Sequence, residues 1–241
     1  MMTSKKITTV LFDLDGTLLP MDQDVFAKTY FNLLAKNLAP HGYDPQAFVA
    51  GLWNSIKTMF VNDGRATNEV VFWQSFAETF GERVYGDKIW FDTFYAEHFD
   101  EVAASCGYDE RAAQVIALCR DKGLVTALAT NPIFPRIATE KRMRWAGLNP
   151  ADFALYTTYE DSRYCKPNLN YYQEILSQLG VCGEECLMVG NDVSEDMVAE
   201  KLGMRVFLLT DCMIHKNKDV DITKYPQGGF DDLLSYIERL D

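Results

Sequence analysis

The sequence predicts an α/β protein in which an all-helical region is inserted into a doubly wound parallel sheet. Three observations predict this class. Short apolar segments alternate with amphipathic helical segments from residue 109 onward. Four of these helical segments end at a glycine, the residue that most often ends helices. Residues 21–108 show helical periodicity and many aromatic side chains, but no pattern of a buried strand.

The predicted strands are continuously apolar and rich in β-branched or aromatic side chains, as strands buried on both faces of a parallel sheet are. They comprise a strand that ends at residue 12 and the segments 124–129, 153–158, 186–190 and 205–210. The helices predicted between and after them cover residues 109–123, 135–147, 168–180, 194–203 and 230–240. In a doubly wound sheet of this kind, ligands bind at the carboxyl ends of the strands.

The segment 21–108 leaves the predicted sheet after its first strand and rejoins it before the second. Its aromatic side chains recur at helical spacing, which is typical of a small helical core rather than of a surface that stacks bases. We therefore expect two domains. Residues 1–20 and 109–241 form a catalytic core, and residues 21–108 form a helical cap over the ligand-binding edge of the sheet.

The composition is that of an ordinary globular protein with an acidic balance. Lys and Arg number 23 against 35 Asp and Glu, which gives a net charge of −12. A chain this acidic is not expected to bind nucleic acid or an anionic membrane, both of which attract basic surfaces. An anionic small substrate stays possible, because a metal ion or one lysine can make the local electrostatic potential positive.

No segment directs the chain to a membrane or out of the cell. The opening MMTSKK lacks the apolar core of a secretory signal, and no apolar stretch approaches the ~18 residues of a membrane span. The six cysteines form no CxxC pair, so they are expected to be reduced thiols. The three histidines are scattered, which argues against a zinc site. These observations predict a cytoplasmic protein.

Polar side chains capable of chemistry follow four of the predicted strands. They are Asp13, Asp15, Gly16 and Thr17 after the first strand, Thr130 and Asn131 after the second, Lys166 after the third, and Asn191, Asp192 and Asp196 after the fourth. Taken singly, each group fits a turn, a solvated loop or a helix cap. Together they bring acids, a hydroxyl and a lysine to one edge of the sheet, which predicts an active site.

These motifs resemble the haloacid dehalogenase-like (HAD) hydrolase superfamily, in its phosphatase branch with a helical cap between the first and second motifs. The resemblance rests on DxDGT at 13–17, a run ending in Thr-Asn at 130–131, Lys-Pro at 166–167 and GNDxxxD at 190–196. It covers residues 8–210. One departure stands out: the family often places an acid directly after the glycine, whereas this chain has Asn191 there and Asp192 next.

The resemblance implies a role for each motif. Asp13 would be the nucleophile that forms an aspartyl-phosphate. Asp15 would protonate the leaving alcohol and then activate the hydrolytic water. Thr130 would hydrogen-bond the transferred phosphoryl group, and Lys166 would hold that group and Asp13 by charge. Further substrate contacts are expected from Gly16, Thr17 and Asn131.

Mg²⁺ is the cofactor that the resemblance implies, since it takes oxygen ligands from one or two carboxylates, the substrate phosphate and water. Its expected protein ligands are the carboxylates of Asp13 and Asp192 and the main-chain carbonyl of Asp15. Asn191 and Asp196 would lie behind these ligands, where Asp196 would orient metal-bound waters.

The leading prediction is a Mg²⁺-dependent phosphatase that acts on a small phosphorylated metabolite, as a monomer or a homodimer. A phosphomutase would use the same residues. A dehalogenase would need no acid at Asp15, because a halide leaves without a proton. A receiver-like signalling domain also carries a phosphorylatable aspartate on a doubly wound sheet, but it needs neither a general acid nor helices over its site.

The substrate itself is not predicted by the motifs, because selectivity is expected to come from the cap. Lys57, Arg65 and Arg83 are basic residues of the cap that could meet a second anionic group. The simpler interpretation is that each is a solvated surface charge.

Overall fold

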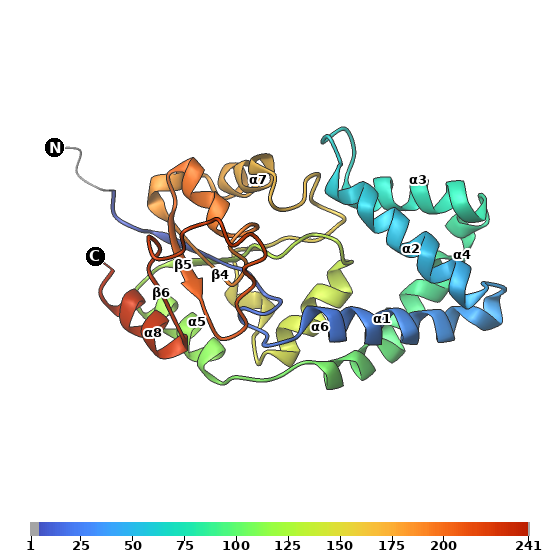
Figure 1. The fold of residues 1–241 in the computed structure, drawn as a ribbon, viewed down its shortest axis with the longest axis horizontal. Coiled ribbons are helices and arrows are strands. Elements are labelled where there is room, and N and C mark those ends of the chain that lie inside the picture. The colour runs from blue at the N-terminus through green and yellow to red at the C-terminus, as the bar shows by residue number, and fades with distance from the viewer. Residues whose placement is uncertain (1–4, 241) are drawn as a thin grey trace.

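The fold is built on one six-stranded sheet in which all neighbouring strands are parallel (Figure 1). The computed structural model describes residues 5–240. The strands are β1 (Thr9–Phe12), β2 (Val125–Leu128), β3 (Leu155–Tyr156), β4 (Cys186–Gly190), β5 (Arg205–Leu209) and β6 (Gln227–Gly228), in the spatial order β3-β2-β1-β4-β5-β6. The prediction of a doubly wound parallel sheet is confirmed.

Strand β1 lies near the centre of the sheet, between β2 and β4. Its four residues are all buried. Phe12, the last of them, pairs in register with Leu128 of β2 and with Val189 of β4. The residues that follow these three strands therefore emerge at the same edge of the sheet, where ligands bind in folds of this kind.

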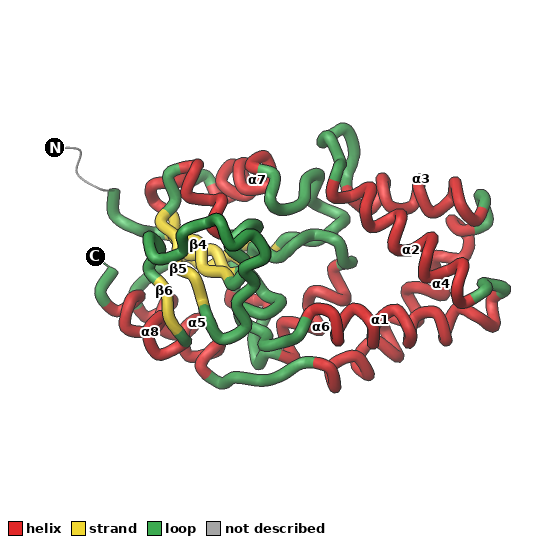
Figure 2. The backbone as a smooth tube through the Cα atoms, viewed as in Figure 1, coloured by secondary structure: helices red, strands yellow, loops and turns green. Residues whose placement is uncertain are grey.

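Helices cover both faces of the sheet (Figure 2). The core under one face receives side chains from α5 (Arg111–Asp121), α6 (Arg136–Trp145) and α8 (Phe230–Glu238). The core under the other face receives side chains from α7 (Leu169–Leu179). Strand β1 supplies both cores, because Val10 and Phe12 belong to the first and Leu11 to the second. Side chains alternate across a strand in this way.

The segment between β1 and α5 is mainly helical. It comprises α1 (Gln23–Leu38), a 3₁₀ turn (Ala39–His41), α2 (Pro45–Phe60), α3 (Asn68–Phe80), α4 (Val84–Thr93), a π-helical turn (Phe94–His98) and a 3₁₀ helix (Phe99–Ser105). Figure 1 shows α1 to α4 grouped at one end of the molecule, beside the sheet. Within residues 5–240, no helix combines the length and the apolar character that a membrane span requires.

Aromatic rings form the core of these inserted helices. Phe48 of α2, Phe76 of α3 and Phe91 of α4 are all buried. The ring centroid of Phe76 lies 5.9 Å from that of Phe48 and 5.7 Å from that of Phe91, within the range of favourable aromatic pairs. Aromatic side chains at helical spacing thus serve as packing here, as the sequence predicts.

Two elements differ from the sequence prediction. Residues 194–203 are predicted to be an α-helix, but the structure has a 3₁₀ helix at Met197–Leu202. The main-chain N–H of Asp196 donates to the carbonyl of Asp192 at 2.9 Å, so the first residues of the segment form a turn and few remain for a regular helix. Strand β6 is not predicted, because its two residues form no apolar run.

Candidate active site

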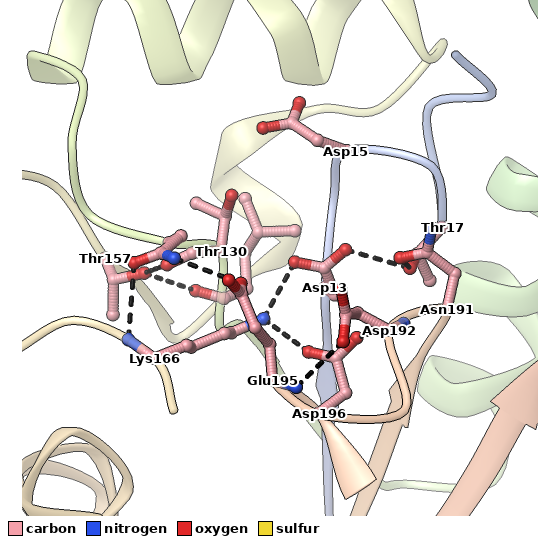
Figure 3. A network of polar contacts seen from close by, with 12 residues as sticks. Asp13, Asp15, Thr17, Thr130, Thr157, Lys166, Asn191, Asp192, Glu195 and Asp196 are labelled. Atoms are coloured by element: carbon pink, nitrogen blue, oxygen red, sulfur yellow. Dashed lines mark hydrogen bonds and ion pairs between the residues drawn. The ribbon is translucent and has the colours of Figure 1, made fainter. Parts of the chain in front are cut away.

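A cavity of about 300 Å³ lies between the carboxyl ends of β1, β2 and β4 and the helices α1 and α2. Seven of the predicted site residues line it: Asp13, Asp15, Thr130, Asn131, Asn191, Asp192 and Asp196. Thr17 and Lys166 contact Asp13 from behind the lining. The structure therefore gathers side chains from four separate loops at one place (Figure 3).

Asp13 is held by two partners at the end of β1. Its Oδ1 accepts a hydrogen bond from Nζ of Lys166 at 2.8 Å, and its Oδ2 accepts one from Oγ1 of Thr17 at 2.9 Å. The residue is only 7% exposed. A carboxylate fixed through both oxygens has a defined orientation, which an attacking nucleophile requires.

The turn after Asp13 depends on a glycine. Gly16 has a φ of +85°, a conformation that side-chain-bearing residues rarely adopt. A Cβ at this position would also lie 2.3 Å from Nδ2 of Asn191. This close approach brings Oγ1 of Thr17 within 3.1 Å of Oδ1 of Asn191, so the turn joins the loops after β1 and β4.

Lys166 lies in the loop after β3 and is buried between two aspartates. Its Nζ donates to Oδ1 of Asp13 at 2.8 Å and to Oδ1 of Asp196 at 2.6 Å. Burial alone would lower the pKa of Lys166, but attraction from Asp13 and Asp196 outweighs it and raises the pKa well above its ordinary value. The ammonium group therefore stays charged at neutral pH.

Asp196 uses both of its carboxylate oxygens within the protein. Besides the bond to Lys166, its Oδ2 accepts the main-chain N–H of Asp192 at 2.9 Å. The side chain is 1% exposed. Its oxygens thus hold Lys166 and the loop after β4, and the expectation that Asp196 orients metal-bound waters stays a prediction.

Asn191 and Asp192 have different surroundings although they are adjacent. Nδ2 of Asn191 donates to the carbonyl of Cys212 at 2.7 Å, which ties this amide to the loop after β5. Oδ1 of Asp192 accepts main-chain N–H groups of Ser194 at 2.7 Å and Glu195 at 3.0 Å. Asp192 lines the cavity and engages these partners through one oxygen only, so it is the better placed of the two for a metal ligand.

Thr130 and Asn131 follow β2 and line the cavity. The carbonyl of Thr130 accepts hydrogen bonds from Oγ1 of Thr157 at 2.6 Å and from the hydroxyl of Tyr171 at 2.8 Å. Oδ1 of Asn131 accepts the main-chain N–H of Lys166 at 3.3 Å. These bonds fix the strand end from its main chain, so the Thr130 hydroxyl is left for a ligand.

Glu195 is a cavity residue that the sequence analysis does not identify. In the structure its Oε2 accepts a hydrogen bond from Nδ2 of Asn131 at 3.1 Å. Burial raises the pKa of Glu195 to about 7, and the charges of Asp192 and Asp13 add to this effect while Lys166 opposes it.

Asp15 also lines the cavity, but its side chain turns away from Asp13. Figure 3 shows its carboxylate apart from the network around Lys166. Oδ2 of Asp15 accepts a hydrogen bond from Nη1 of Arg142 on α6, whereas Oδ1 is buried without a partner among the described residues. Burial raises the pKa of Asp15 above its ordinary value, although Arg142 acts in the opposite direction.

Arg142 is the second residue that the sequence analysis does not identify. It is 0% exposed, and its guanidinium lies 4.3 Å from the ring centroid of Phe134, where a cation–π contact is favourable. Nη2 also donates to Oγ1 of Thr139 at 3.3 Å. Its position four residues after the buried Ala138 is the one signal of burial in the sequence.

The two acidic side chains predicted as metal ligands, Asp13 and Asp192, line the same cavity as Asp15, whose main-chain carbonyl is the third predicted ligand. Within residues 5–240, no cluster of three or more His, Cys, Asp or Glu side chains is arranged to hold a metal ion. The candidate ligands are therefore the carboxylates of Asp13 and Asp192 and the carbonyl of Asp15. All three are oxygen donors, which suit a hard cation.

The Asp15–Arg142 pair makes a testable contribution to stability. Replacing Arg142 by Met leaves Asp15 buried without its partner, and this should lower the free energy of unfolding by about 3–5 kcal/mol. Adding Asp15→Asn should recover a large part of that loss, because the uncompensated charge is removed. Urea denaturation of the two single variants and the double variant measures the coupling, and strictly additive losses would contradict it.

The raised pKa of Glu195 predicts a pH dependence of stability. Because the folded protein keeps a proton on Glu195 up to a pH of about 7, against an ordinary pKa of 4.5, this residue stabilises the fold at low pH. That contribution is lost as pH rises from 4.5 to 7. The free energy of unfolding should therefore decrease by on the order of 1–3 kcal/mol over this interval, and Glu195→Gln should abolish this decrease.

The measurement is urea denaturation at several pH values in the presence of a chelator, so that no divalent cation changes the charge of the site. Glu184→Gln, at an exposed position, is the control. If the free energy of unfolding had the same dependence on pH in the unmodified chain and in Glu195→Gln, the raised pKa of Glu195 would be contradicted.

Comparisons with known proteins agree with this fold. A family model for haloacid dehalogenase-like hydrolases matches residues 7–202. A HAD phosphatase from Thermococcus onnurineus is 19% identical with a TM-score of 0.60, and the match covers 96% of this chain and 98% of that chain. A 2-haloacid dehalogenase from Pseudomonas syringae is also 19% identical, with a TM-score of 0.62 and coverage of 98% and 100%.

A third solved structure is the putative HAD-hydrolase YfnB from Bacillus subtilis bound to magnesium. It is 18% identical with a TM-score of 0.56, and the match covers 97% of this chain and 99% of that chain. Comparison with curated proteins gave no match. At these identities the solved structures establish the fold, and the family model establishes membership. The chain belongs to the haloacid dehalogenase-like hydrolases.

Proposed function

We propose that this hydrolase is a Mg²⁺-dependent phosphatase that acts on small phosphate monoesters through an aspartyl-phosphate at Asp13. One observation carries the proposal: two acids two residues apart, Asp13 and Asp15, line the same cavity in different surroundings. Asp13 is held by a lysine, as suits a nucleophile. Burial raises the pKa of Asp15 above its ordinary value although Arg142 lowers it, as suits a group that gives up and takes back a proton.

Asp13 would attack the phosphorus atom and displace the alcohol. Lys166 would offset the negative charge that gathers as a carboxylate approaches a phosphate. Thr130 and Asn131 also line the cavity, and the hydroxyl of Thr130 and the amide of Asn131 would donate hydrogen bonds to phosphoryl oxygens. These groups supply positioning and charge, on which phosphoryl transfer chiefly depends.

Asp15 would donate a proton to the departing oxygen and then take one from the water that hydrolyses the intermediate. To do so, its carboxylate has to rotate from Arg142 toward Asp13. Its unpartnered Oδ1 supports such a rotation, because the present rotamer satisfies only one of the two oxygens. Arg142 would then be a positioning residue that holds the carboxylate of Asp15 away from Asp13 between turnovers.

The oxygen donors of the site fit Mg²⁺. Asp13, Asp192 and the Asp15 carbonyl would hold it, and Mg²⁺ commonly keeps several waters rather than a full set of protein ligands. When bound, the ion neutralises charge on the phosphate and on Asp13. The helices α1 to α4 would form a cap domain, residues 21–108, that limits the access of water to the site.

A dehalogenase is the second candidate, because solved dehalogenases share the fold. It would use Asp13 to displace a halide, which needs no proton. The presence of an acid at Asp15 in the cavity favours an oxygen leaving group instead.

The role of the cation predicts that activity depends on Mg²⁺. The purified protein should release phosphate from an aryl phosphate in the presence of Mg²⁺, and EDTA should remove at least ~99% of the rate, since uncompensated charge costs several kcal/mol at the transition state. Phosphate release is measured directly, and added Mg²⁺ should restore it. An undiminished rate in EDTA would contradict the role of the cation.

The role of Asp15 predicts a dependence on the leaving group. Asp15→Asn should slow the hydrolysis of an alkyl phosphate by about 10²–10⁴-fold and that of an aryl phosphate by much less, because a phenolate leaves without full protonation. The readout is kcat for both substrates. Asp121→Asn on α5 is a control for loss of one negative charge. Equal losses on both substrates would argue against the acid role.

A further inference from the structure

We propose that the alcohol released by this enzyme is apolar, about one aromatic ring in size, and carries no second anionic group. This inference rests on the proposed phosphatase function and adds the class of substrate. It follows from the side of the cavity that faces away from Asp13, where the inserted helices supply the lining.

The lining on this side is aromatic and aliphatic. Helix α1 contributes Phe26, Tyr30 and Phe31, and helix α2 contributes Trp53, Ile56 and Phe60. The hydroxyl of Tyr30 already pairs with that of Tyr95 at 2.6 Å, so this residue offers its ring rather than a polar group. The residues Ile133 and Phe134 continue the same surface after β2.

Two of these side chains are exposed to an unusual degree for their size. Trp53 is 45% and Phe60 is 39% exposed, and both border the cavity. Large apolar side chains that remain in contact with water at the wall of a cavity favour a ligand that covers them. A ring on the substrate would stack against Trp53, whose edge already contacts Phe31 at 5.7 Å between centroids.

The inserted helices place no cation in the cavity to receive a second anion. The candidates from the sequence contact other side chains: Lys57 is over the ring of Trp53 at 5.8 Å, Arg65 pairs with Asp63 at 2.7 Å and Arg83 pairs with Asp87 at 2.9 Å. None of the three lines the cavity. The expectation that they are surface charges is the one that this geometry favours.

The remaining charges near the cavity also disfavour a second anion. Arg142 is fully buried and bonded to Asp15. Among the described residues that line the cavity, Lys216 is the one lysine or arginine, and it is an exposed residue of the loop after β5 rather than of α1 or α2. Asp24 at the start of α1 adds a negative charge to the lining. A carboxylate or second phosphate on the leaving group would be repelled there.

The size of the cavity limits the ligand further. A volume of about 300 Å³ is at the lower end of small-molecule sites. It accommodates a phosphate on the side of Asp13 and a single ring on the side of Trp53. We therefore expect monophosphate esters of benzyl-type alcohols or phenols to be preferred over phosphorylated acids and polyols.

The test compares three alkyl phosphates in the presence of Mg²⁺: benzyl phosphate, glycerol phosphate and phosphoglycolate. A pocket built for an apolar group should give benzyl phosphate at least a tenfold higher kcat/KM than either of the others. Equal values, or a preference for phosphoglycolate, would overturn the inference while leaving the phosphatase function intact. If no phosphate were released even from an aryl phosphate, the phosphatase function itself would fail, and the inference with it.

Variants of the exposed wall residues test whether α2 causes the preference. Trp53→Ala should lower kcat/KM for benzyl phosphate about tenfold, chiefly through KM, and lower that for phosphoglycolate much less. Phe60→Lys should raise the ratio of phosphoglycolate to benzyl phosphate, because it adds the missing cation. The matched control is Trp90→Ala, since Trp90 on α4 is 39% exposed and stacks on His41 outside the cavity.

Trp53→Ala and Phe60→Lys replace side chains that are already in contact with water. The fold should therefore survive both substitutions, and thermal melts verify this. A loss of activity that is equal for benzyl phosphate and phosphoglycolate in Trp53→Ala would overturn the assignment of this wall. The assignment would also be overturned if Trp90→Ala changed the ratio of kcat/KM for benzyl phosphate to that for phosphoglycolate as much as Trp53→Ala does.

Discussion

The site depends on one buried ion pair network, in which the ammonium of Lys166 bridges Asp13 and Asp196. Buried charges are costly unless they are paired and hydrogen-bonded, and removal of one partner leaves the others uncompensated. The network joins three segments: the end of β1, the loop after β3 and the loop after β4. It therefore forms only when the parallel sheet has brought these ends together, and it then fixes Asp13, the nucleophile that we propose, at the end of β1.

A second buried pair, between Asp15 and Arg142, contains the residue that we propose as the general acid. Asp13 and Asp15 are two residues apart, yet opposite charges hold them in opposite directions, Lys166 on one side and Arg142 on the other. In our account this separation gives the two acids different tasks. We also propose that the aromatic lining from α1 and α2 selects the leaving group. The cavity would then hold the nucleophile, the general acid and the residues that set specificity.

The elements that could be predicted from the sequence are those whose signal is local. Continuous apolar runs identify the core strands, and the acids, hydroxyl and lysine in the segments that follow them identify the candidate site, because parallel strands end at one edge. Arg142 and Glu195 escaped prediction since each owes its role to a distant partner, Asp15 or Asn131. Strand β6 was not predicted because its two residues, Gln227 and Gly228, form no apolar run. The 3₁₀ helix after Asp196 was not predicted because the turn at its start leaves few residues for a regular helix.

The central claim is that phosphorus becomes covalently bound to the carboxylate at the end of β1. The most direct test is to quench the enzyme with acid during turnover of a phosphate ester and to analyse its peptides by mass spectrometry. Our account predicts a phosphoryl group on the peptide that contains Asp13, at the oxygen of that side chain, and none on other acids of the site. A phosphoryl group on a different residue, or an unmodified enzyme while phosphate is being released in a burst, would contradict it.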